Sequence, residues 1–200
     1  TSGIVPPDSE TLRYLKEEAG VTDKIEIFSP DDDAVYEKVI EIDVSSLVPQ
    51  IACPHRVDNI KNIDKVVGTK IDQVVIGSCT NGRLDDIEVA ARTVKGKKVE
   101  RLTRLLVFPA TWRIYRKAME LGYIADLADA GAVICNPGCG ACLGVHQGAL
   151  GDKEVALATT NRNFKGRMGN PNAEIYLCSP VVAAASAITG VITDPGKGGN

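Results

Sequence analysis

Apolar runs of four or five residues alternate with helical patterns through most of the chain after residue 72. The runs that predict buried strands are QVVIG (73–77), RLLVF (104–108), AVIC (132–135), VALAT (155–159) and IYLC (175–178). Helices are predicted at 84–95, at 111–121 and from Pro180 to Gly190. Strands that alternate with helices predict an α/β fold with a mainly parallel sheet. We expect helices on both faces of this sheet, in a three-layer α/β/α arrangement.

The first 68 residues follow other patterns. A helix is predicted from Ser9 to Ala19, because its leucines share one face and a glycine follows it. Polar and apolar residues alternate at 24–28 and 35–44, which predicts two strands. Residues 45–68 are interrupted by prolines and are expected to form a long surface segment.

Composition narrows the classes of protein that the chain can belong to. The 200 residues are 44% hydrophobic, enough for one sizeable core and a small appendage. No apolar run is long enough to span a bilayer, and the first ten residues lack the basic and apolar regions of a secretory signal. The 23 basic and 26 acidic residues nearly balance, which argues against nucleic acid as a partner. Residue 1 is Thr rather than Met, which indicates a truncated or processed chain.

The predicted strands are followed by unusual segments. These segments are SCTN (78–81), PAT (109–111), NPGCGACLG (136–144) and TNRNFKGR (160–167). In an open parallel sheet, ligands bind beyond the carboxyl ends of the strands. All four segments are therefore expected at one edge of the sheet, where they would form a site.

The cysteines of this edge favour metal binding. Without a secretory signal a reducing cytoplasm is expected, where clustered thiols more often bind metal or take part in catalysis than form disulfides. Cys79, Cys139 and Cys142 supply three sulfur ligands. Three thiolates suit an iron–sulfur cluster with one iron open to water or substrate, because a closed cluster takes four. The three remaining cysteines, at 53, 135 and 178, are expected to act as small hydrophobic residues.

Two other classes stay open on spacing alone. Adding His146 to the three cysteines would give a Cys3His zinc site in a binding or assembly module without catalysis. A thiol oxidoreductase could use the Cys139–Cys142 pair, although such motifs usually open a helix. Arg162 and Arg167 favour an enzyme over both, because guanidinium groups bind carboxylates bidentately and would suit a di- or tricarboxylate substrate.

Three segments taken together resemble the signatures of the aconitase superfamily. They are GSCTNGR (77–83), NPGCGACLG (136–144) and TTNRNFKGRMG (159–169). The resemblance runs from about Pro30 to Asp194, in order and without large gaps. The short loops are most similar to the prokaryotic branch that acts on isopropylmalate or homoaconitate.

This resemblance implies a hydro-lyase that isomerises a 2-hydroxy di- or tricarboxylate by dehydration and rehydration. It implies that Cys79, Cys139 and Cys142 bind a 4Fe–4S cluster in which one iron has no protein ligand. It further implies that Arg162 and Arg167 bind the carboxylates of the substrate.

The resemblance also places Ser78, Asn81 and Asn161 near the cluster. Ala141 departs from the pattern, because aconitases more often have proline between the paired cysteines. Both residues fit between two ligands, so the departure leaves the implied cluster unchanged.

The rest of the family's site is implied to lie elsewhere. The acid–base residues of the family belong to upstream domains, and its catalytic serine to a swivelling domain that is often a separate small subunit. The resemblance therefore implies no catalytic residue in this chain, a small hydroxy-carboxylate substrate and a small-subunit partner. Residues 1–28 are expected to be the tail of a preceding domain and residues 29–200 the cluster-binding domain. No nucleic acid or membrane partner is expected, and the implied compartment is the cytoplasm.

Overall fold

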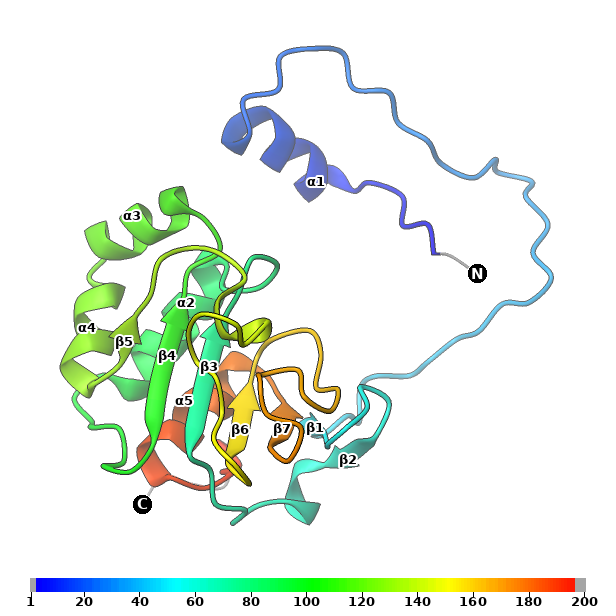
Figure 1. Ribbon diagram of the computed structural model, residues 1–200. Helices are drawn as coiled ribbons and strands as arrows, with labels where there is room; N and C mark the ends of the chain where they lie inside the picture. The colour runs from blue at the N-terminus through cyan, green and yellow to red at the C-terminus, as the bar shows by residue number, and fades with distance from the viewer. Residues whose placement is uncertain (1–2, 197–200) are drawn as a thin grey trace. The chain divides into compact units, whose positions relative to one another are not determined.

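A computed structural model of the chain describes residues 3–196. The chain divides into two compact units, of which the first ends at Ser46 and the second begins at Leu47 (Figure 1). The sequence predicted a domain boundary after residue 28. The first compact unit ends 18 residues beyond that boundary in the sequence, and the domain boundary itself stays a prediction.

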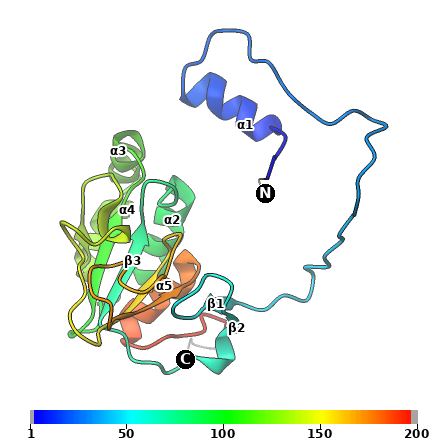
Figure 2. The same cartoon turned by 45° about the vertical axis from the view of Figure 1, so that its right-hand side comes forward.

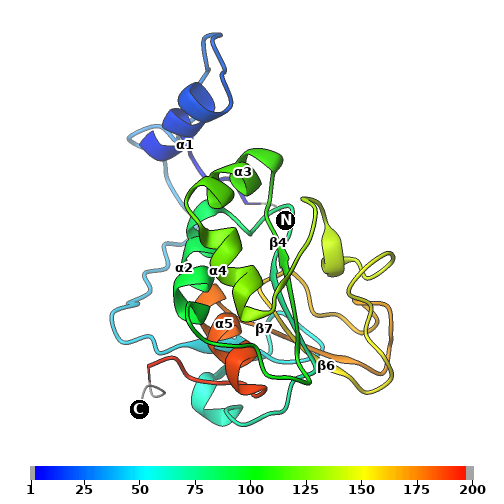
Figure 3. The same cartoon turned by 90° about the vertical axis from the view of Figure 1, so that its left-hand side faces the viewer.

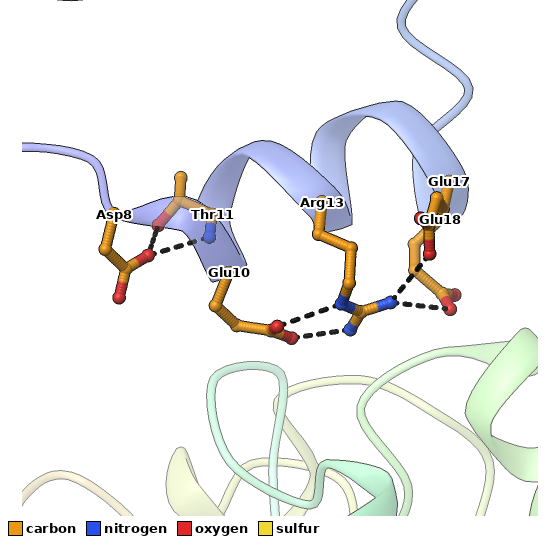
Figure 4. Close-up of polar contacts among 6 residues, drawn as sticks. All are labelled: Asp8, Glu10, Thr11, Arg13, Glu17 and Glu18. Carbon is orange, nitrogen blue, oxygen red and sulfur yellow. Dashed lines mark hydrogen bonds and ion pairs between the residues drawn. The ribbon is translucent and has the colours of Figure 1, made fainter.

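The first unit contains the predicted helix. Helix α1 (Ser9–Arg13) continues into a π-helical turn, η1 (Tyr14–Glu18). The carboxylate of Asp8 caps it, accepting hydrogen bonds from the backbone N and the Oγ1 of Thr11, each 2.7 Å long (Figure 4). Arg13 forms ion pairs with three glutamates of the same helix, Glu10, Glu17 and Glu18. A helix starting at Ser9 is therefore confirmed.

The two strands predicted in the first unit are wrong. The structure has no helix or strand between residues 20 and 49. Ile40, Ile42 and Val44, the expected inward face, are 63 to 74% exposed. A strand is stable only when its backbone groups pair with a neighbouring strand, and the described part of the chain gives this segment no partner.

The second unit is built on a seven-stranded sheet (Figure 1). Its order is β2-β1-β7-β6-β3-β4-β5. The strands are β1 (Gln50–Ala52), β2 (Ile60–Asn62), β3 (Gln73–Gly77), β4 (Arg104–Phe108), β5 (Val133–Ile134), β6 (Val155–Ala158) and β7 (Glu174–Leu177). Strands β3 to β7 pair in parallel, whereas β1 pairs antiparallel with β2 and β7. The predicted α/β class with a mainly parallel sheet is confirmed.

Strands β1 and β2 correct the prediction for residues 45–68. Most of this segment is exposed, as expected, but it also forms a hairpin of β1 and β2 (Figure 2). Strand β1 pairs with β7 and so joins the hairpin to the edge of the sheet. Ile51 and Ile63 bury their side chains in the core. The strands are too short for the alternating pattern to be recognised in the sequence.

One face of the sheet is covered by α-helices (Figure 3). The helices are α2 (Leu84–Val94), α3 (Trp112–Glu120), α4 (Tyr123–Ala130) and α5 (Pro180–Thr189). Val74, Ile76 and Val107 of the sheet share a buried core with helical residues such as Ile87 and Leu127. Helix α4 was not predicted separately; it follows α3 after Gly122, which adopts a left-handed conformation.

The other face differs from the expected helical layer. Val75 and Ala158 of the sheet pack there against Ala141, Leu150 and Met168. These three residues belong to loops, and the only helical element of the described loops on this face is the short 3-10 turn η3 (Gly140–Cys142) (Figure 3). Glycine and proline are frequent in these segments and disfavour α-helix. No described helix is both long enough and apolar enough to cross a membrane.

Two glycines allow the backbone after β3 to approach the end of β4. A Cβ added to Gly77 or Gly82 would lie 2.1 or 2.3 Å from the carbonyl oxygen of Phe108, with φ at +88° and +80°. The backbone N of Ala110 donates to the carbonyl of Gly82 over 2.9 Å. Any side chain at either position would therefore push the β3 loop away from β4.

We predict that Gly82→Ala destabilises the protein more than Gly96→Ala. Both glycines have a positive φ, but nothing lies within 4 Å of a Cβ at Gly96. Gly96→Ala should cost about 1–2 kcal/mol from the left-handed backbone alone. Gly82→Ala should cost about 1–3 kcal/mol more, because backbone atoms must move. Urea unfolding of both variants tests this, and equal losses of unfolding free energy would contradict it.

Candidate functional site

The segments after β3, β4, β5 and β6 meet at one edge of the sheet, as parallel pairing requires (Figure 1). Side-chain hydrogen bonds connect the loop after β3 to the loop after β6. The backbone N of Gly77 donates to Thr159 Oγ1 over 2.8 Å. Asn81 Nδ2 donates to the carbonyl of Thr159 and, over 3.3 Å, to Asn161 Oδ1. Two loops that are 80 residues apart in the sequence are thereby joined.

Ser78, Asn81 and Asn161, the residues expected near a cluster, all belong to this network. Ser78 is buried, and its hydroxyl donates to Asn81 Oδ1 over 3.2 Å. Asn161 Nδ2 donates to Thr80 Oγ1 over 2.5 Å. The three residues therefore shape the loop that carries Cys79.

Two of the three expected thiol ligands are in contact. Cys79 Sγ and Cys139 Sγ lie 3.7 Å apart, although 60 residues separate them in the sequence. Cys142 follows in the same loop as Cys139, where its backbone N donates to the carbonyl of Cys139 over 3.2 Å. Cys79 and Cys139 are exposed, whereas Cys142 is buried.

The pKa of the Cys79 thiol is raised, and its causes tie the three cysteines together. The largest is the hydrogen bond with Cys139, followed by burial and then by the like charges of Cys139 and Cys142. The thiols are thus within electrostatic reach of one another. Binding of a metal group must release protons from them, because only thiolates are ligands.

The two expected arginines differ in their surroundings. Arg162 is exposed. Arg167 is half-buried, and its Nη2 lies 3.8 Å from Cys142 Sγ. Its buried Nε has no hydrogen-bond partner among the described residues.

Asn163, between these arginines, was missed by the sequence analysis. It is fully buried, and its Nδ2 donates to the carbonyl oxygens of Ala52, Cys53 and Arg56, the shortest of these bonds being 2.8 Å long. The side chain fixes the arginine-bearing loop to the turn after β1. No pattern in the sequence distinguishes this asparagine from its neighbours, because its partners lie more than 100 residues away.

The Cys3His zinc alternative has no support in the geometry. His146 is exposed, and its Nε2 lies 3.1 Å from Gln147 Nε2. Among the residues that the structure describes, no three His, Cys, Asp or Glu side chains converge on a point that one metal ion could occupy. A structural zinc requires four such ligands around one ion. An iron–sulfur cluster differs, because each thiolate binds its own iron.

The other cysteines match their expected role as small hydrophobic residues. Cys53 and Cys135 are buried, and burial is the first cause that raises the pKa of each thiol. Burial also raises the pKa of Cys178. All six cysteines are free thiols in the structure.

Comparison with known proteins decides the family. The model of the aconitase family (aconitate hydratase) matches residues 1–69 and 59–190. The chain belongs to the aconitase family. Membership implies an iron–sulfur cluster, and three thiols on two adjoining loops are a donor set that fits one.

Several relatives are identical to this chain at about half of the aligned positions. The 3-isopropylmalate dehydratase large subunit 2 of Archaeoglobus fulgidus is 54% identical over 97% of this chain and 46% of the relative. A probable 3-isopropylmalate dehydratase large subunit of Methanothermobacter thermautotrophicus is 53% identical over 98% of this chain and 46% of the relative. The 3-isopropylmalate dehydratase large subunit of Caldicellulosiruptor bescii is 51% identical over 97% of this chain and 45% of the relative. The chain thus spans about half the length of these relatives.

We predict that Cys79 in the metal-free protein is alkylated only at a higher pH than an ordinary thiol. The thiolate is the reactive form, and a raised pKa leaves less of it at a given pH. Cys139→Ala removes the largest cause of the shift, so the pH profile of Cys79 alkylation should move to lower pH. Mass spectrometry after iodoacetamide treatment gives both profiles. The same pH profile of Cys79 alkylation in the unmodified protein and in Cys139→Ala would show that Cys139 does not raise the pKa of Cys79.

Proposed function

We propose that this chain is the cluster-bearing part of the large subunit of a hydro-lyase. The substrate would be a 2-hydroxy di- or tricarboxylate of the isopropylmalate or homoaconitate type, isomerised by dehydration and rehydration. The observation that supports this most is the contact of Cys79 with Cys139 at the edge where Cys142 and two arginines also lie. Relatives named 3-isopropylmalate dehydratase large subunit, each at least half identical, support the reaction class.

In this proposal Cys79, Cys139 and Cys142 hold a 4Fe–4S cluster. When bound, such a cluster with one iron free of protein ligands supplies a Lewis acid that favours departure of the substrate hydroxyl. Asn81 and Asn161 hold the Cys79 loop against the loop after β6 through their hydrogen bonds. The thiols are thereby positioned before the substrate arrives, which lowers the reorganisation that the reaction requires.

Arg162 and Arg167 are proposed to bind the carboxylates of the substrate. A planar guanidinium donates two parallel N–H groups to one carboxylate and so fixes its orientation. Fixing the carboxylate also stabilises the negative charge that develops on it when the neighbouring carbon loses a proton. Asn163 holds the loop that presents both arginines.

The groups that move protons are proposed to lie outside this chain. The name large subunit, which the relatives carry, supports a small-subunit partner. We place the acid–base residues in a preceding domain and the catalytic serine on that partner. Residues 29–200 remain our proposed cluster-binding domain, with residues 1–28 as the tail of the preceding one, and the cytoplasmic location stays a prediction.

Anaerobic reconstitution with iron and sulfide tests the proposed cofactor. We expect the protein to bind iron and sulfide in equal amounts and to develop broad visible absorption that reduction bleaches. Cys79→Ala and Cys139→Ala should each lose most of the bound iron, because the cluster loses one of three protein ligands. Cys135→Ala, a buried thiol outside the site, is the control and should retain it. Iron retained in both site variants, or zinc bound by the unmodified protein, would contradict the proposal.

We predict that Arg162→Lys damages catalysis in the complete enzyme far more than Lys165→Ala. Lysine keeps the charge but replaces two parallel donors by a single ammonium on a flexible stem. Losing a hydrogen bond to a charged group costs about 1.5–3 kcal/mol, roughly ten- to over a hundredfold in kcat/KM. Lys165 is exposed, and its change should stay within about 0.5 kcal/mol.

The comparison of these two variants requires matched cluster content, because a loss of iron would lower both rates. Steady-state kinetics on each candidate hydroxyacid then gives kcat/KM for every variant. An Arg162→Lys enzyme within a factor of about two of the unmodified one would remove Arg162 from the substrate site.

A further inference from the structure

Arg167 lies against a proposed cluster ligand, and this contact separates it from the other cations of its loop. Its Nη2 is 3.8 Å from Cys142 Sγ, within the range of a hydrogen bond to sulfur. A guanidinium has five N–H donors and no acceptor, so the arginine must donate and the sulfur accept. Cys142 is also the one buried thiol of the three, at 8% exposure. Burial strengthens an electrostatic contact, because water screens it less.

The backbone on both sides of this contact leaves little freedom to move. A Cβ added to Gly144 would lie 2.5 Å from the Cα of Met168, so the cysteine loop and the arginine loop touch backbone to backbone. Met168 is fully buried, and its carbonyl accepts a hydrogen bond from the backbone N of Leu150 over 2.9 Å. Arg167, which immediately precedes Met168, is therefore held beside Cys142 by the packing of its neighbours.

Arg162 and Lys165 carry the same charge in the same loop but are exposed. The backbone N of Arg167 donates to the carbonyl of Phe164 over 2.9 Å, which turns the chain between these exposed residues and the buried Met168. The loop thus presents Arg162 outward and keeps Arg167 at the sulfur. The two arginines are not equivalent, although the sequence gives them the same expected role.

We propose that Arg167 sets the reduction potential of the cluster through its hydrogen bond to the sulfur of Cys142, in addition to binding substrate. This inference rests on the proposed function, because it requires a cluster on Cys142. A donor and a positive charge at a ligating sulfur stabilise the form of the cluster that carries the extra electron. Arg167 therefore raises the reduction potential of the cluster. In this role it acts through the sulfur of Cys142 and is a positioning residue.

The midpoint potential of the reconstituted complete enzyme tests this role without any measurement of turnover. Redox titration followed by electron paramagnetic resonance gives the ratio of reduced to oxidised cluster at each applied potential. Arg167→Gln should lower that ratio about tenfold at a fixed potential, a shift of about 59 mV for one electron. Lys165→Gln is the matched control, since it removes one positive charge from the same loop at an exposed position. Its ratio should stay within about twofold of the unmodified enzyme.

Arg167→Lys provides the second variant, because it keeps the charge and removes the planar fork. We expect its potential to lie between those of the unmodified enzyme and Arg167→Gln. Equal potentials for the two Arg167 variants, the Lys165→Gln control and the unmodified enzyme would overturn the inference and leave the proposed function standing. A cluster that fails to assemble even in the unmodified enzyme would overturn both. Circular dichroism of each variant separates a change in potential from a loss of folding.

Discussion

The parallel pairing of β3 with both β4 and β6 is the constraint on which the site depends. Parallel strands end at the same edge, so the segments that follow them come together whatever their distance in the sequence. Five residue pairs align β3 with β4, and three align β3 with β6. A shift of one residue between β3 and β4 would displace Cys79, which follows β3, relative to Cys139, which follows β5 on the far side of β4. It would also turn the buried side chains of the shifted strand to the other face.

The two faces of the sheet have different roles, because one is packed for stability and the other carries the loops of the site. Helices α2, α4 and α5 bury apolar side chains on one face, where packing alone suffices. Loops cover the other face, and they are held by specific hydrogen bonds such as those of Thr159, Asn81 and Asn163. Each such bond contributes about 0.5–1.5 kcal/mol, so only several together can fix a loop. This arrangement leaves glycine-rich backbone close to the thiols, which a helical layer would not allow.

Much of the second unit was predictable from the sequence because its signals are local. Strand β3 contains the apolar run VVIG, Thr111 caps α3 by accepting from the backbone N of Ile114, and Ser179 with Pro180 opens α5. The alternating pattern at 35–44 failed because a strand depends on a partner that no local pattern can report. The loops that stand in place of the expected helical layer on the second face were not predictable for a related reason. Its order comes from long-range contacts, such as Asn163 to Cys53 and Gly144 to Met168.

The sequence predicted which residue types form the site, but it did not predict the different surroundings of the two arginines. The rule for parallel sheets was enough to place the cysteines and arginines at one edge. It could not distinguish exposed Arg162 from half-buried Arg167, which contacts the sulfur of Cys142. The central claim is that three thiolates hold a cluster in which one iron is open to substrate. Its most direct test is Mössbauer spectroscopy of the complete enzyme reconstituted with iron-57, before and after addition of the hydroxyacid. Three protein thiolates predict that the substrate changes the spectrum of one iron site and leaves the others unaltered. A spectrum in which no iron site responds to the substrate would contradict an open iron and the function built on it.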